Sequence, residues 1–201
     1  MPSSLRPLAA AGSKAVFFDR KGTLPDGTGG LDQDSWTDAV HGLSLLQAHG
    51  YKIILIHNAT GALSPGISAM TLKQLCANEG IILNGSYRCP QHPCVPAPEC
   101  ECCLPGSSLL TRAAAEHGVD LARSWMVGPI LDAIEAGRRA QCRTILHDRG
   151  LETQWQMTPL RSPHHVVRSL QEAAHLIVSR DTAVSWRSMD QKQAALNKSV
   201  A

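Results

Sequence analysis

The segment over residues 15–24, Ala-Val-Phe-Phe-Asp-Arg-Lys-Gly-Thr-Leu, constrains the fold more than any other part of the sequence. Its four leading apolar residues predict a buried strand, and Gly22 allows a sharp turn after it. Ligand crevices in open α/β sheets lie at the carboxyl ends of the strands, where Asp19 is expected. A carboxylate there can bind a metal or attack phosphorus to form an aspartyl-phosphate. The simpler alternative is an Asp that caps the turn.

Strands and helices are predicted to alternate along most of the chain. Strands are expected over 51–57, 81–83, 124–128 and 143–147. Helices are expected over 36–49, 68–79, 107–117, 131–140 and 166–174, with 176–178 continuing the last helix or forming a short strand. The alternation predicts an α/β fold with a mostly parallel sheet and helices on both faces. Right-handed crossovers would bring Asp19, His57 and Gly128 to one edge of that sheet.

Composition excludes several classes of protein. The net charge is only +2, and the basic residues are scattered, so nucleic acid is not an expected partner. No apolar run approaches the ~20 residues that span a bilayer, and the N-terminal apolar stretch is too short for a signal peptide. We therefore expect a cytoplasmic protein that does not bind membranes. Its expected parts are a flexible segment over 1–13, one domain over 14–179 and a tail over 180–201.

Cysteines are concentrated in one part of the chain. Five of the seven fall within fifteen residues, at Cys89, Cys94, Cys100, Cys102 and Cys103. In a reducing compartment such clustering favours a metal site over disulfides. Prolines interrupt the same stretch, so residues 86–106 are expected to form a metal-binding loop inserted in the domain. Cys76 and Cys142 lie in predicted regular elements and are expected to be buried.

Four segments together resemble the haloacid dehalogenase (HAD) superfamily, and most closely its branch of heptose 1,7-bisphosphate and histidinol phosphatases. The segment around Asp19 resembles that family's Asp-x-Asp-Gly-Thr motif. Residues 57–61 are similar to its Thr-Asn-Gln-Ser-Gly, and residues 126–128 to its Met-Val-Gly-Asp-x-x-x-Asp. The cysteine loop resembles its Cys-Pro-His-His-Pro and Cys-x-Cys-Arg-Lys segments. The resemblance covers about residues 14–178 and implies a HAD-like fold.

The catalytic positions depart from the family pattern. The resemblance places Asp19 at the nucleophile position, whereas Lys21 replaces the Asp that acts as general acid and base. A lysine with an ordinary pKa of about 10.4 is a poor base, and its ammonium would pair with Asp19 unless it points to solvent. The two magnesium-binding positions hold Pro129 and Ala133, which leaves Asp132 as a weak magnesium candidate. Binding of Mg²⁺ is therefore doubtful.

The phosphate-binding positions are partly retained. The resemblance implies that His57, Asn58 and Thr60 contact the substrate phosphate, with His57 in place of a hydroxyl residue. An imidazole can donate to a phosphate, but its charge depends on pH, and a bond to a nearby carbonyl is the alternative. Cys103 and Leu104 occupy the place of the family's Arg-Lys pair. Loss of one such donor costs about 10²–10³ in rate.

The cysteine loop implies a structural zinc site. In the family the ligands are a Cys, a His and a Cys-x-Cys pair, and a closed tetrahedral site of this kind can order a loop. Three of these ligands are retained, at Cys89, Cys100 and Cys102. The family's His position is Gln91, so the fourth ligand is expected to be His92, with Cys94 as the alternative. The opposite interpretation is a loop of free thiols that has lost its metal.

These observations predict a HAD phosphatase-like protein that is catalytically impaired or inactive. Its expected ligand is a sugar phosphate or another small phosphorylated molecule, and regulation through a protein partner is left open. One alternative is an active phosphomonoesterase that uses Asp19 as nucleophile and a histidine for acid–base chemistry. The other is a zinc-stabilised module that contacts a protein partner through its cysteine loop.

Overall fold

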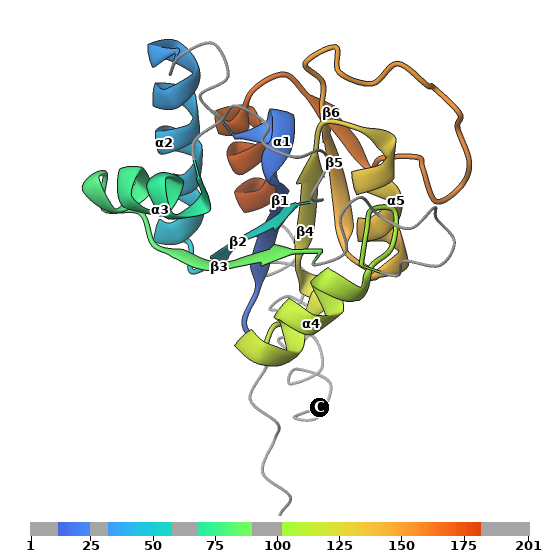
Figure 1. Cartoon of the computed structure of the whole chain (residues 1–201), viewed down its shortest axis with the longest axis horizontal. Coiled ribbons are helices and arrows are strands. Elements are labelled where there is room, and N and C mark those ends of the chain that lie inside the picture. Colours follow the sequence, from blue (N-terminus) through green and yellow to red (C-terminus); the bar gives the residue numbers. More distant parts are fainter. Residues whose placement is uncertain (1–11, 25–31, 58–67, 90–101, 182–201) are drawn as a thin grey trace, which may run out of the picture.

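The computed structural model describes residues 12–24, 32–57, 68–89 and 102–181. Its centre is a six-stranded sheet with the order β3-β2-β1-β4-β5-β6, in which every neighbouring pair is parallel (Figure 1). The strands are β1 Ala15–Asp19, β2 Lys52–His57, β3 Leu83–Arg88, β4 Trp125–Gly128, β5 Arg143–His147 and β6 His165–Val167. This arrangement confirms the predicted α/β fold with a parallel sheet.

Helices cover both faces of the sheet. They are α1 Arg20–Thr23, α2 Gln33–Ala48, α3 Ala69–Asn78, α4 Ser108–His117, the 3₁₀ helix η1 Leu121–Arg123, α5 Leu131–Arg139 and a helix over 170–181. Residues of α2, α3 and the helix over 170–181 pack in one hydrophobic cluster with the sheet. Residues of α4 and α5 pack in another cluster on the opposite face. The domain therefore has three layers, as expected for a doubly covered parallel sheet.

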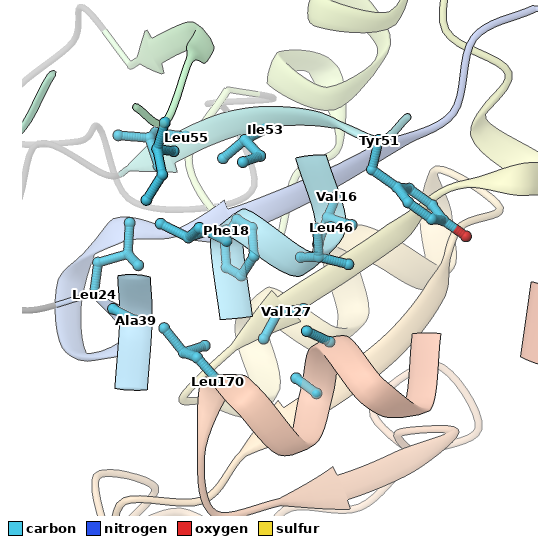
Figure 2. Close-up of a cluster of buried hydrophobic side chains, with 14 of the residues drawn as sticks. Val16, Phe18, Leu24, Ala39, Leu46, Tyr51, Ile53, Leu55, Val127 and Leu170 are labelled. Atoms are coloured by element: carbon cyan, nitrogen blue, oxygen red, sulfur yellow. The ribbon is translucent and has the colours of Figure 1, made fainter. Parts of the chain in front are cut away.

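The alternation of side chains along β1 explains these two clusters. Successive strand residues point to opposite faces, so Val16 and Phe18 enter the cluster under α2, whereas Phe17 enters the cluster under α4 and α5. Figure 2 shows Phe18 and Val127 among the side chains of the first cluster. All strand residues of β1 are buried, which fixes Asp19 at the end of a rigid central strand.

Sequence-based boundaries were wrong in three places. The strand predicted over 81–83 instead runs from Leu83 to Arg88, because its backbone pairs with β2 despite the weak strand propensity of Asn84-Gly85-Ser86. Residues 165–167 form strand β6 beside β5, so the last helix begins at residue 170 rather than 166. Helix α2 begins at Gln33, because the Asp32 carboxylate accepts a hydrogen bond from the Ser35 N–H.

The terminal predictions are only partly covered by the structure. The segments over 1–11 and 182–201 lie outside the described residues, whereas Ser13 forms a β-bridge with Val119. Among the residues described, no helix is long and apolar enough to cross a membrane.

Candidate active site and cysteine cluster

Asp19 lies at the carboxyl edge of the sheet, between the ends of β2 and β4. It is paired in register with Ile56 of β2, so it lies beside His57, while the preceding Phe18 is paired with Val127 of β4. A Cβ atom added to Gly128 would lie 3.5 Å from the Cβ of Asp19. The structure thus brings Asp19, His57 and Gly128 together at one edge, as their strand positions predicted.

The Asp19 carboxyl group is buried, with only 5 % of the residue exposed. Burial, with a smaller contribution from the charge of Asp132, raises its pKa to about 7. A hydrogen bond from the Lys21 backbone N–H and the Lys21 charge act in the opposite direction but are outweighed. Asp19 is therefore only partly ionised at neutral pH, which reduces its nucleophilicity.

The turn after β1 is covered by apolar side chains. Gly22 has a φ of 77°, a conformation that favours glycine. A Cβ atom at Gly22 would lie 2.3 Å from Leu151 Cδ1 and 3.2 Å from Pro129 Cγ. Pro129 occupies the first magnesium-ligand position of the family pattern, and it lies against this turn with ring carbons instead of a carboxylate.

Asp132 is held by an arginine. Its Oδ1 accepts a hydrogen bond of 2.6 Å from Arg161 Nη2, and the Arg161 side chain is only 19 % exposed. Magnesium prefers several carboxylate, phosphate and water oxygens in an octahedron. At Asp19 the structure instead offers a buried carboxyl group of raised pKa, the cationic Lys21 and an Asp132 already in an ion pair. The residues described around Asp19 do not fit a magnesium ion.

Glu152 caps helix α5 and was missed by the sequence analysis. Its Oε2 accepts a hydrogen bond of 2.7 Å from the Leu131 N–H, and its Oε1 accepts one of 2.6 Å from the Gln154 N–H. A carboxylate at this end of a helix interacts favourably with the helix dipole. The cap comes from the segment between β5 and β6, and no local motif near residue 131 could have indicated it.

His57 lies beside two arginines. Its Nε2 is 3.4 Å from Ser86 Oγ on β3. Burial, followed by the charges of Arg20 and Arg88, lowers its pKa to about 4. The imidazole is therefore neutral at pH 7 and cannot replace a cationic phosphate ligand. The other two predicted phosphate-binding residues, Asn58 and Thr60, lie outside the described residues.

Three cysteines converge where β3 ends and the segment before α4 begins. The Sγ atoms of Cys89, Cys102 and Cys103 all lie within 4.8 Å of one another. Cys89 and Cys102 are paired as a disulfide, against the expectation from the sequence, and Cys103 Sγ is 3.3 Å from Cys89 Sγ. Thiolates around a tetrahedral zinc ion, with Zn–S near 2.3 Å, lie about 3.8 Å apart. The three residues could therefore hold a metal ion only after the disulfide is reduced and its sulfurs separate.

The cysteine cluster contains two of the predicted zinc ligands and adds one residue, Cys103, that was not predicted. Cys89 and Cys102 are brought together as predicted, whereas His92, Cys94 and Cys100 lie outside the described residues. Cys103 had been assigned to the place of a lost arginine, but its sulfur is buried in the cluster. Its direct adjacency to Cys102 is the signal that could have indicated this. Cys76 and Cys142 are buried, as predicted.

Together, the parallel sheet, the buried aspartate at the end of its central strand and the glycine of β4 beside it define a HAD-like hydrolase fold. A family model described as HAD-hydrolase-like matches residues 102–173. The structure of D,D-heptose 1,7-bisphosphate phosphatase from B. bronchiseptica, complexed with magnesium and phosphate, has the same fold. Its TM-score is 0.62 at 18 % identity, covering 84 % of this chain and 99 % of that chain.

Curated relatives identify the family more narrowly. D-glycero-beta-D-manno-heptose-1,7-bisphosphate 7-phosphatase from Haemophilus ducreyi is 30 % identical over 148 residues, which are 66 % of this chain and 81 % of the relative. The protein of that name from Helicobacter pylori (strain J99) is 32 % identical over 168 residues, which are 76 % of this chain and 88 % of the relative. The chain belongs to the heptose 1,7-bisphosphate phosphatase family of HAD-like hydrolases.

Proposed function

We propose that this protein binds a phosphorylated sugar in the crevice at Asp19 and hydrolyses it slowly or not at all. The family membership supports a sugar-phosphate ligand, since the relatives are named as heptose bisphosphate phosphatases. The ion pair between Asp132 and Arg161 carries the second part of the proposal. This ion pair engages the Asp132 carboxylate, which would have to replace the magnesium ligand lost at Pro129.

Three requirements of phosphoryl transfer are weakened at once. The nucleophile must be ionised, but burial raises the pKa of Asp19 to about 7. A general acid and base is needed, but the family position holds Lys21, a poor base at neutral pH. The charge that develops on the phosphoryl group must be stabilised, but Cys103 and Leu104 stand in place of the family's Arg-Lys pair, and His57 adds no charge because burial lowers its pKa to about 4.

Phosphate release provides the direct test. The wild-type protein would be incubated with a panel of sugar phosphates, including heptose 1,7-bisphosphate, in the presence of Mg²⁺. The Asp19→Asn variant serves as the control, because it lacks the nucleophile but keeps the shape of the side chain. We expect little or no release above this control. Turnover in the ordinary enzymatic range of about 1–10³ s⁻¹ that disappears in Asp19→Asn would overturn the proposal and establish an active phosphomonoesterase.

A second experiment asks whether the substituted positions limit activity. The double variant Lys21→Asp/Pro129→Asp restores two of the three carboxylates that the family pattern has and this chain lacks. It is expected to release phosphate at least tenfold faster than wild type, in a magnesium-dependent manner. The matched control is Lys73→Asp, which makes one of the same changes at an exposed position on α3, remote in sequence from Asp19, Pro129 and Arg161. An equal gain in the control would show that the effect is not local.

We also propose that Cys89, Cys102 and Cys103 hold a structural zinc ion, with one further ligand from the segment over 90–101. A reducing compartment, such as the cytoplasm expected for this protein, would open the Cys89–Cys102 disulfide and keep these thiols available. The ion would tie the end of β3 to the segment that leads into α4. It stabilises the fold rather than taking part in hydrolysis.

Cobalt substitution can test this ligand set, because thiolate-to-cobalt absorption scales with the number of cysteine ligands. In Cys103→Ser we expect this absorption to fall by about a quarter to a third, as for a site of three or four thiolates. In His92→Ala we expect no change. Thiolate absorption that is unchanged in Cys103→Ser would leave Cys103 outside the site, and a shift of the cobalt d–d bands in His92→Ala would assign the fourth ligand to His92.

A further inference from the structure

A second cavity opens on the α2 side of the sheet, close to the β1–α1 turn. Its volume is about 240 Å³, and its walls come from α1, the first turns of α2, the end of β5 and the start of the helix over 170–181. Its lining includes Thr23 and His147 together with Arg149 and Arg168. The site proposed above for phosphoryl chemistry uses none of these four residues.

Two of the lining residues carry buried polar atoms without a hydrogen-bond partner. These atoms are Thr23 Oγ1 and His147 Nδ1, and neither finds a partner in the described part of the chain. Thr23 is fully buried, and His147 is only 3 % exposed. Folded proteins satisfy nearly all buried polar groups, and an unpaired one is costly. Two such atoms at one cavity indicate that a bound molecule completes their hydrogen bonds.

The protonation of His147 determines which partner it needs. Its ring forms a hydrogen bond to the Arg168 backbone, and burial and the Arg149 charge lower its pKa, so the ring is neutral. A neutral imidazole that donates one N–H to a carbonyl has its other nitrogen free as an acceptor. Nδ1 is therefore expected to accept a hydrogen bond from a donor such as a hydroxyl group.

The charged side chains around the cavity favour an anion. Arg149 and Arg168 are exposed and make no ion pair with any residue that the structure describes. Guanidinium groups suit phosphate and carboxylate oxygens. The carboxylate of Asp38 keeps its negative charge, but it accepts hydrogen bonds from the N–H groups of Leu170 and Gln171 and forms no ion pair with either arginine. Asp34, an exposed acid on α2, can accept from a hydroxyl group.

We propose that this cavity is a binding site for a small phosphate monoester that carries hydroxyl groups, distinct from the crevice at Asp19. Arg149 and Arg168 bind the phosphate. Thr23 and His147 bind a hydroxyl group, which supplies the partners that their buried atoms lack. Since Thr23 ends the turn that begins after Asp19, a ligand here also contacts the segment that shapes the crevice. The site does not depend on whether the protein is an active phosphatase.

Calorimetric titration of the full-length protein with glucose 6-phosphate provides the first test. The protein is expected to bind two equivalents, one here and one in the crevice proposed above, and Arg149→Gln/Arg168→Gln should weaken only the first, by at least tenfold. The matched control Arg112→Gln/Arg139→Gln removes the same charge from two i,i+4 ion pairs on α4 and α5 and should bind as wild type does. Lys21→Ala, which removes the cation beside Asp19 but no residue that lines the cavity, should retain binding here.

Three results would overturn the proposal: no binding at millimolar concentration, equal affinity in the Arg149→Gln/Arg168→Gln variant, or loss of binding in Lys21→Ala. The last result would place the sugar phosphate in the crevice. Failure here is distinct from failure of the proposed function, which is decided by phosphate release that depends on Asp19.

Thr23→Val is a second variant that keeps the shape of the side chain and removes its hydroxyl group. Without ligand its Tm should be unchanged or higher, because the hydroxyl has no partner in the fold. Its affinity for glucose 6-phosphate should fall by about three- to tenfold, the usual loss for one neutral hydrogen bond. A lower Tm together with unchanged affinity would show that the hydroxyl serves the fold and not a ligand.

Discussion

Replacing Asp19 with asparagine should make the protein more stable at pH 8. The carboxyl group is buried at the end of β1, and its pKa of about 7 lies above the value of 3.8 for an exposed aspartate. Below pH 4 the group is protonated in both the folded and the unfolded chain, so it has no net effect. As the pH rises from 4 to 7 the unfolded chain releases its proton first, and the folded state loses stability.

The size of this loss follows from the pKa difference. A difference of about three pH units, at about 1.4 kcal/mol each, amounts to ~4 kcal/mol once both states are ionised above pH 7. Asparagine carries no charge and can still accept the hydrogen bond from the Lys21 N–H. The variant gives up the attraction between Asp19 and Lys21, so about 2–4 kcal/mol of stabilisation is expected at pH 8.

Urea unfolding at pH 4, 6 and 8 measures this effect. The difference in unfolding free energy between Asp19→Asn and wild type should be near zero at pH 4 and should grow toward pH 8. The exposed residue Asp34 offers a matched control, and Asp34→Asn should show no comparable rise. A variant that is less stable than wild type at pH 8 would refute the argument, because the ionised carboxylate would then be stabilising the fold.

Three further predictions concern stability and are measured by urea midpoints. Gly22→Ala should destabilise the protein by about 1–3 kcal/mol, because φ is positive there and the new Cβ would collide with Leu151; Leu151→Ala in the same background should recover part of the loss. Leu43→Ala should lower the free energy of unfolding by about 2–5 kcal/mol, since this α2 side chain is fully buried against the sheet. Leu151→Ala alone should lower it by under about 1 kcal/mol, because Leu151 is half exposed. Arg161→Gln should cost about 1 kcal/mol, because Asp132 loses its ion pair while staying partly exposed.

The fold was predictable because its signals are local. Continuous apolar runs such as Ala15–Phe18 and Ile53–Ile56 identify strands buried on both faces, and glycines such as Gly118 end the helices between them. Prediction from the sequence failed where a segment is a strand only because it pairs with another strand. Strand β3 contains Asn84 and Gly85 and is strand only because its backbone bonds to β2. The short strand β6 depends in the same way on β5.

The candidate site likewise has features that local sequence signals predict and features that they do not. The positions of Asp19 and His57 follow from the predicted strands that precede them, so topology alone brings them to one edge of the sheet. Two features join segments far apart in the sequence: the ion pair of Asp132 with Arg161 and the helix cap that Glu152 provides. A third, the inclusion of Cys103 in the cysteine cluster, depends on the direction of its side chain. A single sequence contains no period or motif that reports such contacts.

The central position of β1 has a consequence for the order in which the chain can fold during synthesis. One edge of β1 pairs with β2, which follows within the next forty residues, but the other edge waits for β4. Until Trp125–Gly128 leaves the ribosome, that second edge has free backbone hydrogen-bonding groups and apolar side chains, which are templates for pairing with other chains. Chains that end before β4 should therefore aggregate or need a chaperone, whereas in chains that extend past β5 both edges of β1 can be paired.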